Sequence, residues 1–235
     1  TARNSYGGGT ASPYIGLGGA SAFTLANDLN IETGTSFSLT AQTGVTTIGG
    51  NVTNNGSIVS PLASTTGVPV VFNGTTTISG AQTVTAPSGV TVNAGNSVTL
   101  SGAGQDLAVP ATKVGLINGT VSAGSGTTVT VLGNLTLGAA GSVSGAGATS
   151  TAAATVVSTA NPAGVAITTA GANSFNAATS YTFNGAAAQA AGSLPATVGT
   201  LTVNNATGVS LGGNTTATTL TLTAGELASA GNTLA

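Results

Sequence analysis

The feature that most constrains this chain is a three-residue apolar alternation that recurs along its length. Each occurrence has two apolar residues separated by a Ser or Thr, and a Gly or Asn follows within a few residues. Because successive side chains of a strand point to opposite faces, each occurrence is typical of a short strand with its apolar residues inward. The clearest seven are Val90–Val92, Val98–Leu100, Val129–Val131, Leu135–Leu137, Leu201–Val203, Val209–Leu211 and Leu220–Leu222.

The spacing of these segments favours one of two all-β architectures. Neighbouring segments lie about six to eleven residues apart, which leaves no room for crossover helices. Asn-Gly pairs such as Asn73-Gly74 would serve as hairpin turns in an antiparallel β-sandwich, which remains the alternative. Apolar runs of three to five residues fit the narrow faces of a solenoid better. We therefore expect an all-β fold, a parallel β-helix (β-solenoid) of roughly ten short coils.

The pattern divides the chain unevenly. Residues 1–20 are rich in glycine and carry little apolar alternation, so we expect an N-terminal arm or cap there. Residues 21–235 form the expected β-solenoid. Within it, residues 138–172 are rich in Ala, Gly and Ser and alternate poorly, which indicates a looser coil or a joint between two sub-arrays.

Charge and composition exclude several classes of function. Charged residues make up 3% of the chain, against about 25% in ordinary globular domains, yet 40% of residues are apolar, so the chain is expected to fold. With two basic residues, no histidine and few aromatics, it lacks the features of a nucleic-acid binder. No stretch reaches the roughly 18 consecutive apolar residues of a membrane-spanning helix. The first nine residues show no signal-peptide pattern.

The sequence offers little for catalysis or metal binding. There is no histidine or cysteine, and the single lysine, Lys113, has no serine-protease or lactamase signature around it, so no enzyme activity and no cofactor are predicted. Strand alternation would place Asp28, Asn30 and Glu32 on one face, where their oxygens could contact Ca²⁺. Two acids without a glycine-bounded ligand loop equally suit the outward face of an early strand, so no metal site is predicted.

Three segments near the C-terminus carry a family resemblance. They are Tyr181-Thr-Phe-Asn-Gly185, the run from Leu194 to Gly213, and Leu220-Thr-Leu-Thr-Ala-Gly-Glu-Leu227. These segments resemble the β-strand-repeat surface proteins of Bacteroidetes-type bacteria. The resemblance implies coils of a secreted β-helical adhesin or filament protein, located at the cell surface, with no catalytic residues to carry over. The chain departs from those proteins in lacking a recognisable C-terminal sorting domain.

These observations predict a secreted structural protein at the bacterial surface that assembles with copies of itself. Low charge leaves little repulsion between copies, and a solenoid presents a strand edge at each end. We expect a subunit of a filament, sheath or layer, or an adhesin stalk, with surface glycans or other cells as further partners. The candidate self-assembly residues are Tyr6, Tyr14, Leu227 and Leu234.

Two other functions are kept as alternatives. One is an ice-binding solenoid, since Thr-x-Thr pairs such as Thr128 with Thr130 and Thr219 with Thr221 can lie in rows on a flat face. The other is a β-helix that binds or cleaves polysaccharide.

Overall fold

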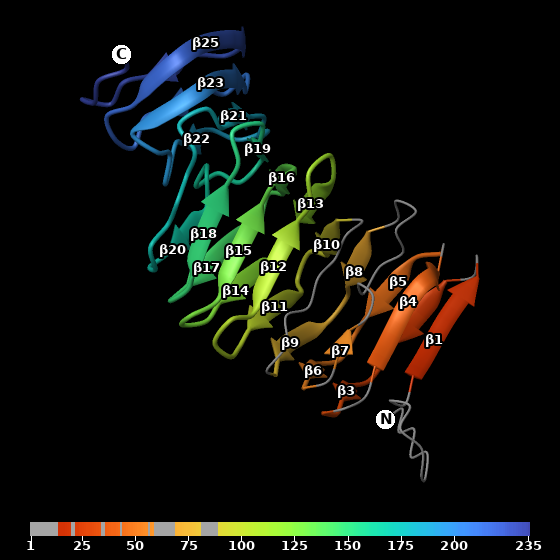
Figure 1. Ribbon diagram of the computed structural model, residues 1–235. Coiled ribbons are helices and arrows are strands. Elements are labelled where there is room, and N and C mark those ends of the chain that lie inside the picture. Colours follow the sequence, from red (N-terminus) through yellow and green to blue (C-terminus); the bar gives the residue numbers. More distant parts are fainter. Residues whose placement is uncertain are drawn as a thin grey trace.

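The computed structural model describes residues 14–19, 22–33, 36–42, 44–55, 57–58, 69–80 and 89–235. These residues form 26 β-strands and no helix, and every pairing between the strands is parallel. The strands stack into one elongated β-solenoid, from β1 at one end to β25 at the other (Figure 1). The expected parallel β-solenoid is confirmed, and the antiparallel sandwich kept as its alternative is wrong.

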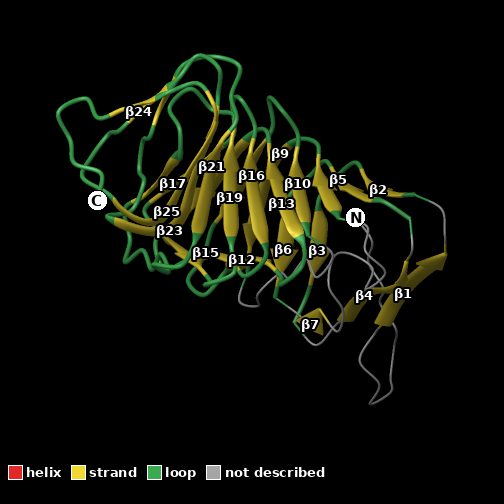
Figure 2. Ribbon diagram, turned by 90° about the horizontal axis from the view of Figure 1, so that it is seen from above, coloured by secondary structure: helices red, strands yellow, loops and turns green. Residues whose placement is uncertain are grey.

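A ten-stranded sheet runs the length of the solenoid and forms its first face (Figure 2). Its strands, in spatial and chain order, are β2 (Phe23–Leu25), β5 (Thr46–Ile48), β8 (Val70–Phe72), β10 (Val90–Val92), β13 (Val114–Ile117), β16 (Asn134–Leu137), β19 (Val156–Thr159), β21 (Ser180–Phe183), β23 (Thr197–Asn204) and β25 (Thr216–Ala224).

The remaining faces are covered by shorter sheets. A seven-stranded sheet contains β3 (Leu29–Ile31), β6 (Val52–Asn54), β9 (Thr75–Ser79), β11 (Ser97–Leu100), β14 (Thr120–Ala123), β17 (Ser142–Gly145) and β20 (Ile167–Thr169). Three-stranded sheets comprise β1 (Tyr14–Gly19), β4 (Ser36–Gln42) and β7 (Ser57–Ile58); β12 (Asp106–Val109), β15 (Thr128–Val131) and β18 (Ala148–Thr151); and β22 (Gln189–Ala190), β24 (Val209–Ser210) and β26 (Leu227–Ala228).

Each central turn of the solenoid contributes one strand to each of three faces. The strands β10, β11 and β12 form one such turn, and β13, β14 and β15 form the next. The solenoid has about eight turns, somewhat fewer than the roughly ten coils predicted. Residues that align on neighbouring strands of the ten-stranded sheet lie up to 25 residues apart in the sequence, as Val90 and Gly115 do. Corner loops therefore lengthen some coils beyond the expected 20 residues.

Apolar alternation places the core where the sequence predicted it. All seven segments singled out above lie on strands or begin in one, and their two apolar residues are buried except in the last of them, Leu220–Leu222, where both are exposed. In β11, for example, Val98 and Leu100 are buried while Ser97 and Thr99 lie half-buried on the outward face. Stacking in register then builds continuous inward columns, so one hydrophobic core extends along the solenoid.

One inward position is occupied by glycine for a steric reason. Gly115 lies between Val90 and Leu135 in the first inward column of the ten-stranded sheet. A Cβ atom added there would lie 2.7 Å from Cγ2 of Val109, which reaches across from β12. The Val109 side chain therefore fills the volume that a side chain at position 115 would need.

Residues 138–172, the expected joint, contain β17 to β20 and carry threonine at inward positions. The hydroxyls of Thr149 and Thr169 lie 2.9 Å apart, and both side chains are buried. The hydroxyl of Thr151 lies 2.8 Å from that of Thr179. Hydrogen bonding between coils thus satisfies polar groups that replace Val and Leu here, which explains the poor alternation of the sequence.

A buried amide network joins the coils near the C-terminal end. Asn205 is fully buried, and its Nδ2 donates to the Ala187 carbonyl at 2.7 Å and to Gln189 Oε1 at 2.8 Å. Gln189 Nε2 donates in turn to the carbonyls of Thr159 and Asn161 at 3.0 and 2.9 Å. The two buried side chains therefore link three successive coils through hydrogen bonds.

Candidate functional site

The strand β25 forms one edge of the ten-stranded sheet. Its inner side pairs with β23, and its first residues are also covered on the outer side by the chain's last residues. The amide of Ala217 donates to the Ala235 carbonyl at 2.9 Å, and the amide of Ala235 donates to the Thr215 carbonyl at 3.0 Å. Among the described residues, no strand pairs with the outer edge of β25 over residues 218–224.

Two leucines are exposed on this part of β25. Leu220 aligns with Leu201, and Leu222 aligns with Val203, so both continue inward columns of the core. Leu201 and Val203 are fully buried, whereas Leu220 is 42% exposed and Leu222 is 54% exposed. The end of the core is therefore open to solvent at β25.

The opposite edge of the same sheet is β2, which among the described residues pairs only with β5. Phe23 and Leu25 point inward and are half-buried against the core, and Thr24 between them is exposed. The register of the ten strands places Phe23 and Leu220 in one column and Leu25 and Leu222 in the other. The two edges thus carry equivalent apolar positions.

The predicted self-assembly residues lie in different places. Tyr6 is outside the described residues. Tyr14 begins β1, whose backbone pairs with β4 at Ser36. Leu227 in β26 and Leu234 are half-buried and pack against the chain's own core, and Leu234 forms a bridge with Thr215.

The apolar groups that β25 exposes are therefore Leu220 and Leu222, which the sequence reasoning had assigned to an ordinary strand. The alternation of this segment is the same as that of the buried strands, so the sequence of the strand itself carries no signal of its exposure.

The candidate calcium ligands lie on β3 and directly beside it. Asp28, Asn30 and Glu32 are exposed, and they flank the buried Leu29 and Ile31, as the alternation predicted. Asp28 Oδ1 accepts a hydrogen bond from the backbone amide of Asn51 at 2.8 Å, which ties β3 to the following coil. Within the described part of the chain, no three acidic, histidine or cysteine side chains gather in a way that could hold a metal ion.

Asp106 is a partly buried carboxyl group at the start of β12. Burial at the start of β12 raises its pKa above the usual value, and a hydrogen bond with Thr130 opposes this shift. Its Oδ1 atom is buried without a hydrogen-bond partner in the described structure. Asp106 lies on β12, beside Thr128 of β15, so its environment is one of hydroxyl groups rather than of other charges.

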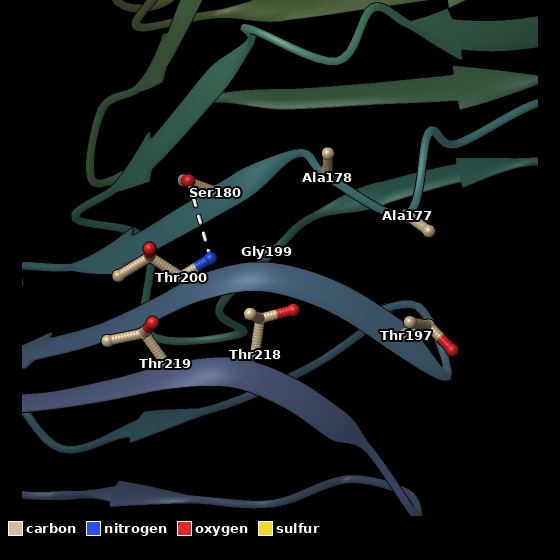
Figure 3. Close-up of a pocket in the computed structure, with 8 residues that line it drawn as sticks. All are labelled: Ala177, Ala178, Ser180, Thr197, Gly199, Thr200, Thr218 and Thr219. Atoms are coloured by element: carbon tan, nitrogen blue, oxygen red, sulfur yellow. Dashed lines mark hydrogen bonds between the residues drawn. The ribbon is translucent and has the colours of Figure 1, made fainter.

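A shallow depression of about 400 Å³ lies on the outer face of the ten-stranded sheet near β25. Figure 3 shows its hydroxyl groups, which come from Ser180, Thr197, Thr200, Thr218 and Thr219. The backbone amide of Thr200 donates to Ser180 Oγ at 3.4 Å. The lining contains hydroxyls, methyls and backbone but no acid, base or thiol, so it offers contact surface rather than reactive groups.

Comparison of the chain with protein-family models, with curated proteins and with solved structures found no match. Among the residues that the structure describes, no helix has the length and apolar character needed to span a bilayer.

Proposed function

We propose that this chain is a structural protein that assembles head to tail with copies of itself. The observation that carries the proposal is the match between the two edges of the ten-stranded sheet. The edge of β25 exposes Leu220 and Leu222, and the edge of β2 carries Phe23 and Leu25 at the equivalent inward positions. A second copy is the occupant that would continue both columns without a change of register.

The proposed interface repeats the contacts already present within the solenoid. If β2 of one copy pairs in parallel with β25 of another, Leu220 meets Phe23 and Leu222 meets Leu25. Thr221 meets Thr24 on the outward side, as Thr202 meets Thr221 within the chain. Such a contact is heterologous, since different surfaces of the two copies meet, and it generates an open filament.

Low charge supports close packing of copies. The chain has two basic and four acidic residues and a formal net charge of −2. Surfaces that keep monomers apart normally carry many more charges. Among the charged residues described here, none lies on β2 or β25.

The proposed physiological role is an extracellular or cell-surface one, as subunit of a filament, sheath or layer, or as an adhesin stalk, with surface glycans or other cells as further partners. The role that we propose is structural rather than enzymatic, in keeping with a chain that has four acidic residues and no histidine or cysteine.

The proposal is tested by electron microscopy and sedimentation velocity across a range of protein concentrations. We expect filaments whose abundance rises with concentration. Leu222→Lys places a charge in the contact. Covering the exposed parts of Leu220 and Leu222 is worth roughly 2–3 kcal/mol, so loss of one leucine and burial of a charge should weaken association at least about tenfold.

Leu132→Lys is the matched control, because Leu132 is 47% exposed on a central coil away from both edges. Assembly should survive that substitution. The double variant Leu222→Lys with Leu25→Glu should assemble again, since opposite charges would then meet at every contact. A parent chain that stays monomeric at all concentrations would refute the proposed function, and equal loss of assembly in Leu222→Lys and Leu132→Lys would refute the interface.

A further inference from the structure

The outward face of the seven-stranded sheet carries a two-dimensional array of hydroxyl groups. On four successive strands, β9, β11, β14 and β17, both outward positions are Ser or Thr. The first row contains Thr75, Ser97, Thr120 and Ser142, and the second contains Thr77, Thr99, Ser122 and Ser144. Thr168 of β20 extends the second row.

Strand register fixes the spacing of this array, which we call the hydroxyl array. Neighbouring strands lie about 4.8 Å apart, and outward residues two apart on one strand lie about 6.6 Å apart. The inward partners Val98, Val121 and Val143 are fully buried, which holds each strand against the core. The hydroxyls of Ser142 and Thr120 also lie within 3.5 Å of each other along the solenoid axis.

The chemistry of the array is uniform. Its nine positions include no charged, aromatic or amide side chain. Every position carries a hydroxyl group, and the five threonines also present a methyl group beside it, so hydrogen-bonding oxygen recurs at regular intervals with weakly hydrated carbon at five of the nine positions. Charged groups would hold their own hydration shells, and aromatic rings would offer a platform for sugar rings.

We propose that the hydroxyl array binds the surface of ice. Ice presents water oxygens at regular intervals in two dimensions, so a rigid array of hydroxyls that orders water in the same manner can join its lattice. A hydrogen bond mediated by a bound water is nearly as favourable in enthalpy as a direct one. Rigid positioning of the hydroxyls lowers the entropy cost of binding. A soluble sugar chain would instead need a groove and stacking rings, which the nine positions do not provide.

This inference is independent of head-to-tail assembly. The array lies on the side of the solenoid, whereas β2 and β25 present strand edges at its ends. A filament would therefore display the array repeatedly rather than cover it.

The test measures thermal hysteresis and ice-crystal shaping by the purified full chain. Ser122→Tyr places a bulky ring in the middle of the array, between Thr99 and Ser144. The matched control is Thr136→Tyr, an outward half-buried position on β16 of the ten-stranded sheet. We expect ice shaping by the parent and by Thr136→Tyr, and its loss in Ser122→Tyr, with all three chains showing the same β-sheet circular dichroism.

Three outcomes would overturn the inference. The parent would show no thermal hysteresis, or Ser122→Tyr would retain the full effect. Alternatively, the parent would bind insoluble cellulose or chitin through this face without shaping ice, which would assign the array to a polysaccharide surface.

Discussion

Asn205→Ala should destabilise the C-terminal coils of the solenoid. The Asn205 side chain makes four hydrogen bonds. It donates to Ala187 and Gln189, and its Oδ1 accepts from the amide of Thr207 at 2.9 Å and from the Thr207 hydroxyl at 2.7 Å. Asn205 itself is fully buried, its bond to Gln189 is buried, and its bonds to Ala187 and Thr207 are partly buried.

The expected magnitude follows from counting these bonds. A net contribution of about 0.5–1 kcal/mol for each of these hydrogen bonds gives a loss of roughly 2–4 kcal/mol in the free energy of unfolding. For a chain of this length, that corresponds to a fall in Tm of about 6–12 °C. Because coils contact only their neighbours, the loss should concentrate near Gln189 and Asn205 rather than spread along the solenoid.

Thermal unfolding followed by circular dichroism measures the total loss, and hydrogen exchange of residues 185–211 measures its location. Asn204→Ala is the control, since Asn204 is adjacent in sequence but exposed. If Asn205→Ala and Asn204→Ala lowered Tm equally, or if exchange rose uniformly along the chain, the argument from the amide network would be wrong.

Three further stability changes follow from the buried groups. Tyr181→Phe should raise the free energy of unfolding by roughly 1 kcal/mol in urea titrations, because the buried Tyr181 hydroxyl has no hydrogen-bond partner in the described structure. Gly115→Val should lower the free energy of unfolding by about 1–3 kcal/mol in the same assay, because the new side chain would clash with Val109. Burial raises the pKa of Asp106, so the folded state binds its proton more tightly than the unfolded state does. Stability should therefore fall as pH rises from the ordinary Asp value of 3.8 through the raised pKa, and Asp106→Asn should remove that fall in urea titrations at several pH values.

The strands themselves were predictable from sequence because alternation acts locally. Val98 and Leu100 are separated by one polar residue, and a parallel stack can bury both only by turning them to the same side. The spacing excluded crossover helices, and the shortness of the apolar runs then favoured the solenoid over an antiparallel sandwich. The number of turns was less predictable, because corner loops differ in length and have no apolar pattern.

Buried polar groups could not be predicted from the same rule. Gln189 and Asn205 have the sequence character of loop residues, and only the three-dimensional stack shows that they lie inside it. Exposure of Leu220 and Leu222 also depends on what covers the last strand rather than on the strand's own residues. The hydroxyl array was missed because its rows join residues more than 20 positions apart, such as Thr77 and Thr99.

The stacking of one strand on the next stabilises the fold, and in the proposed assembly the same stacking joins two copies. Solubility and association are therefore opposed at β25. Each inward column is stabilised by the strand that follows it, and at β25 that contribution is missing over Leu220 and Leu222. Substitutions that make this edge polar should improve the solubility of the single chain while they remove the apolar contact that a second copy would use. Substitutions that enlarge its apolar surface should strengthen association and lower solubility. Solubility of the isolated chain and its tendency to assemble should therefore change in opposite directions at Leu222.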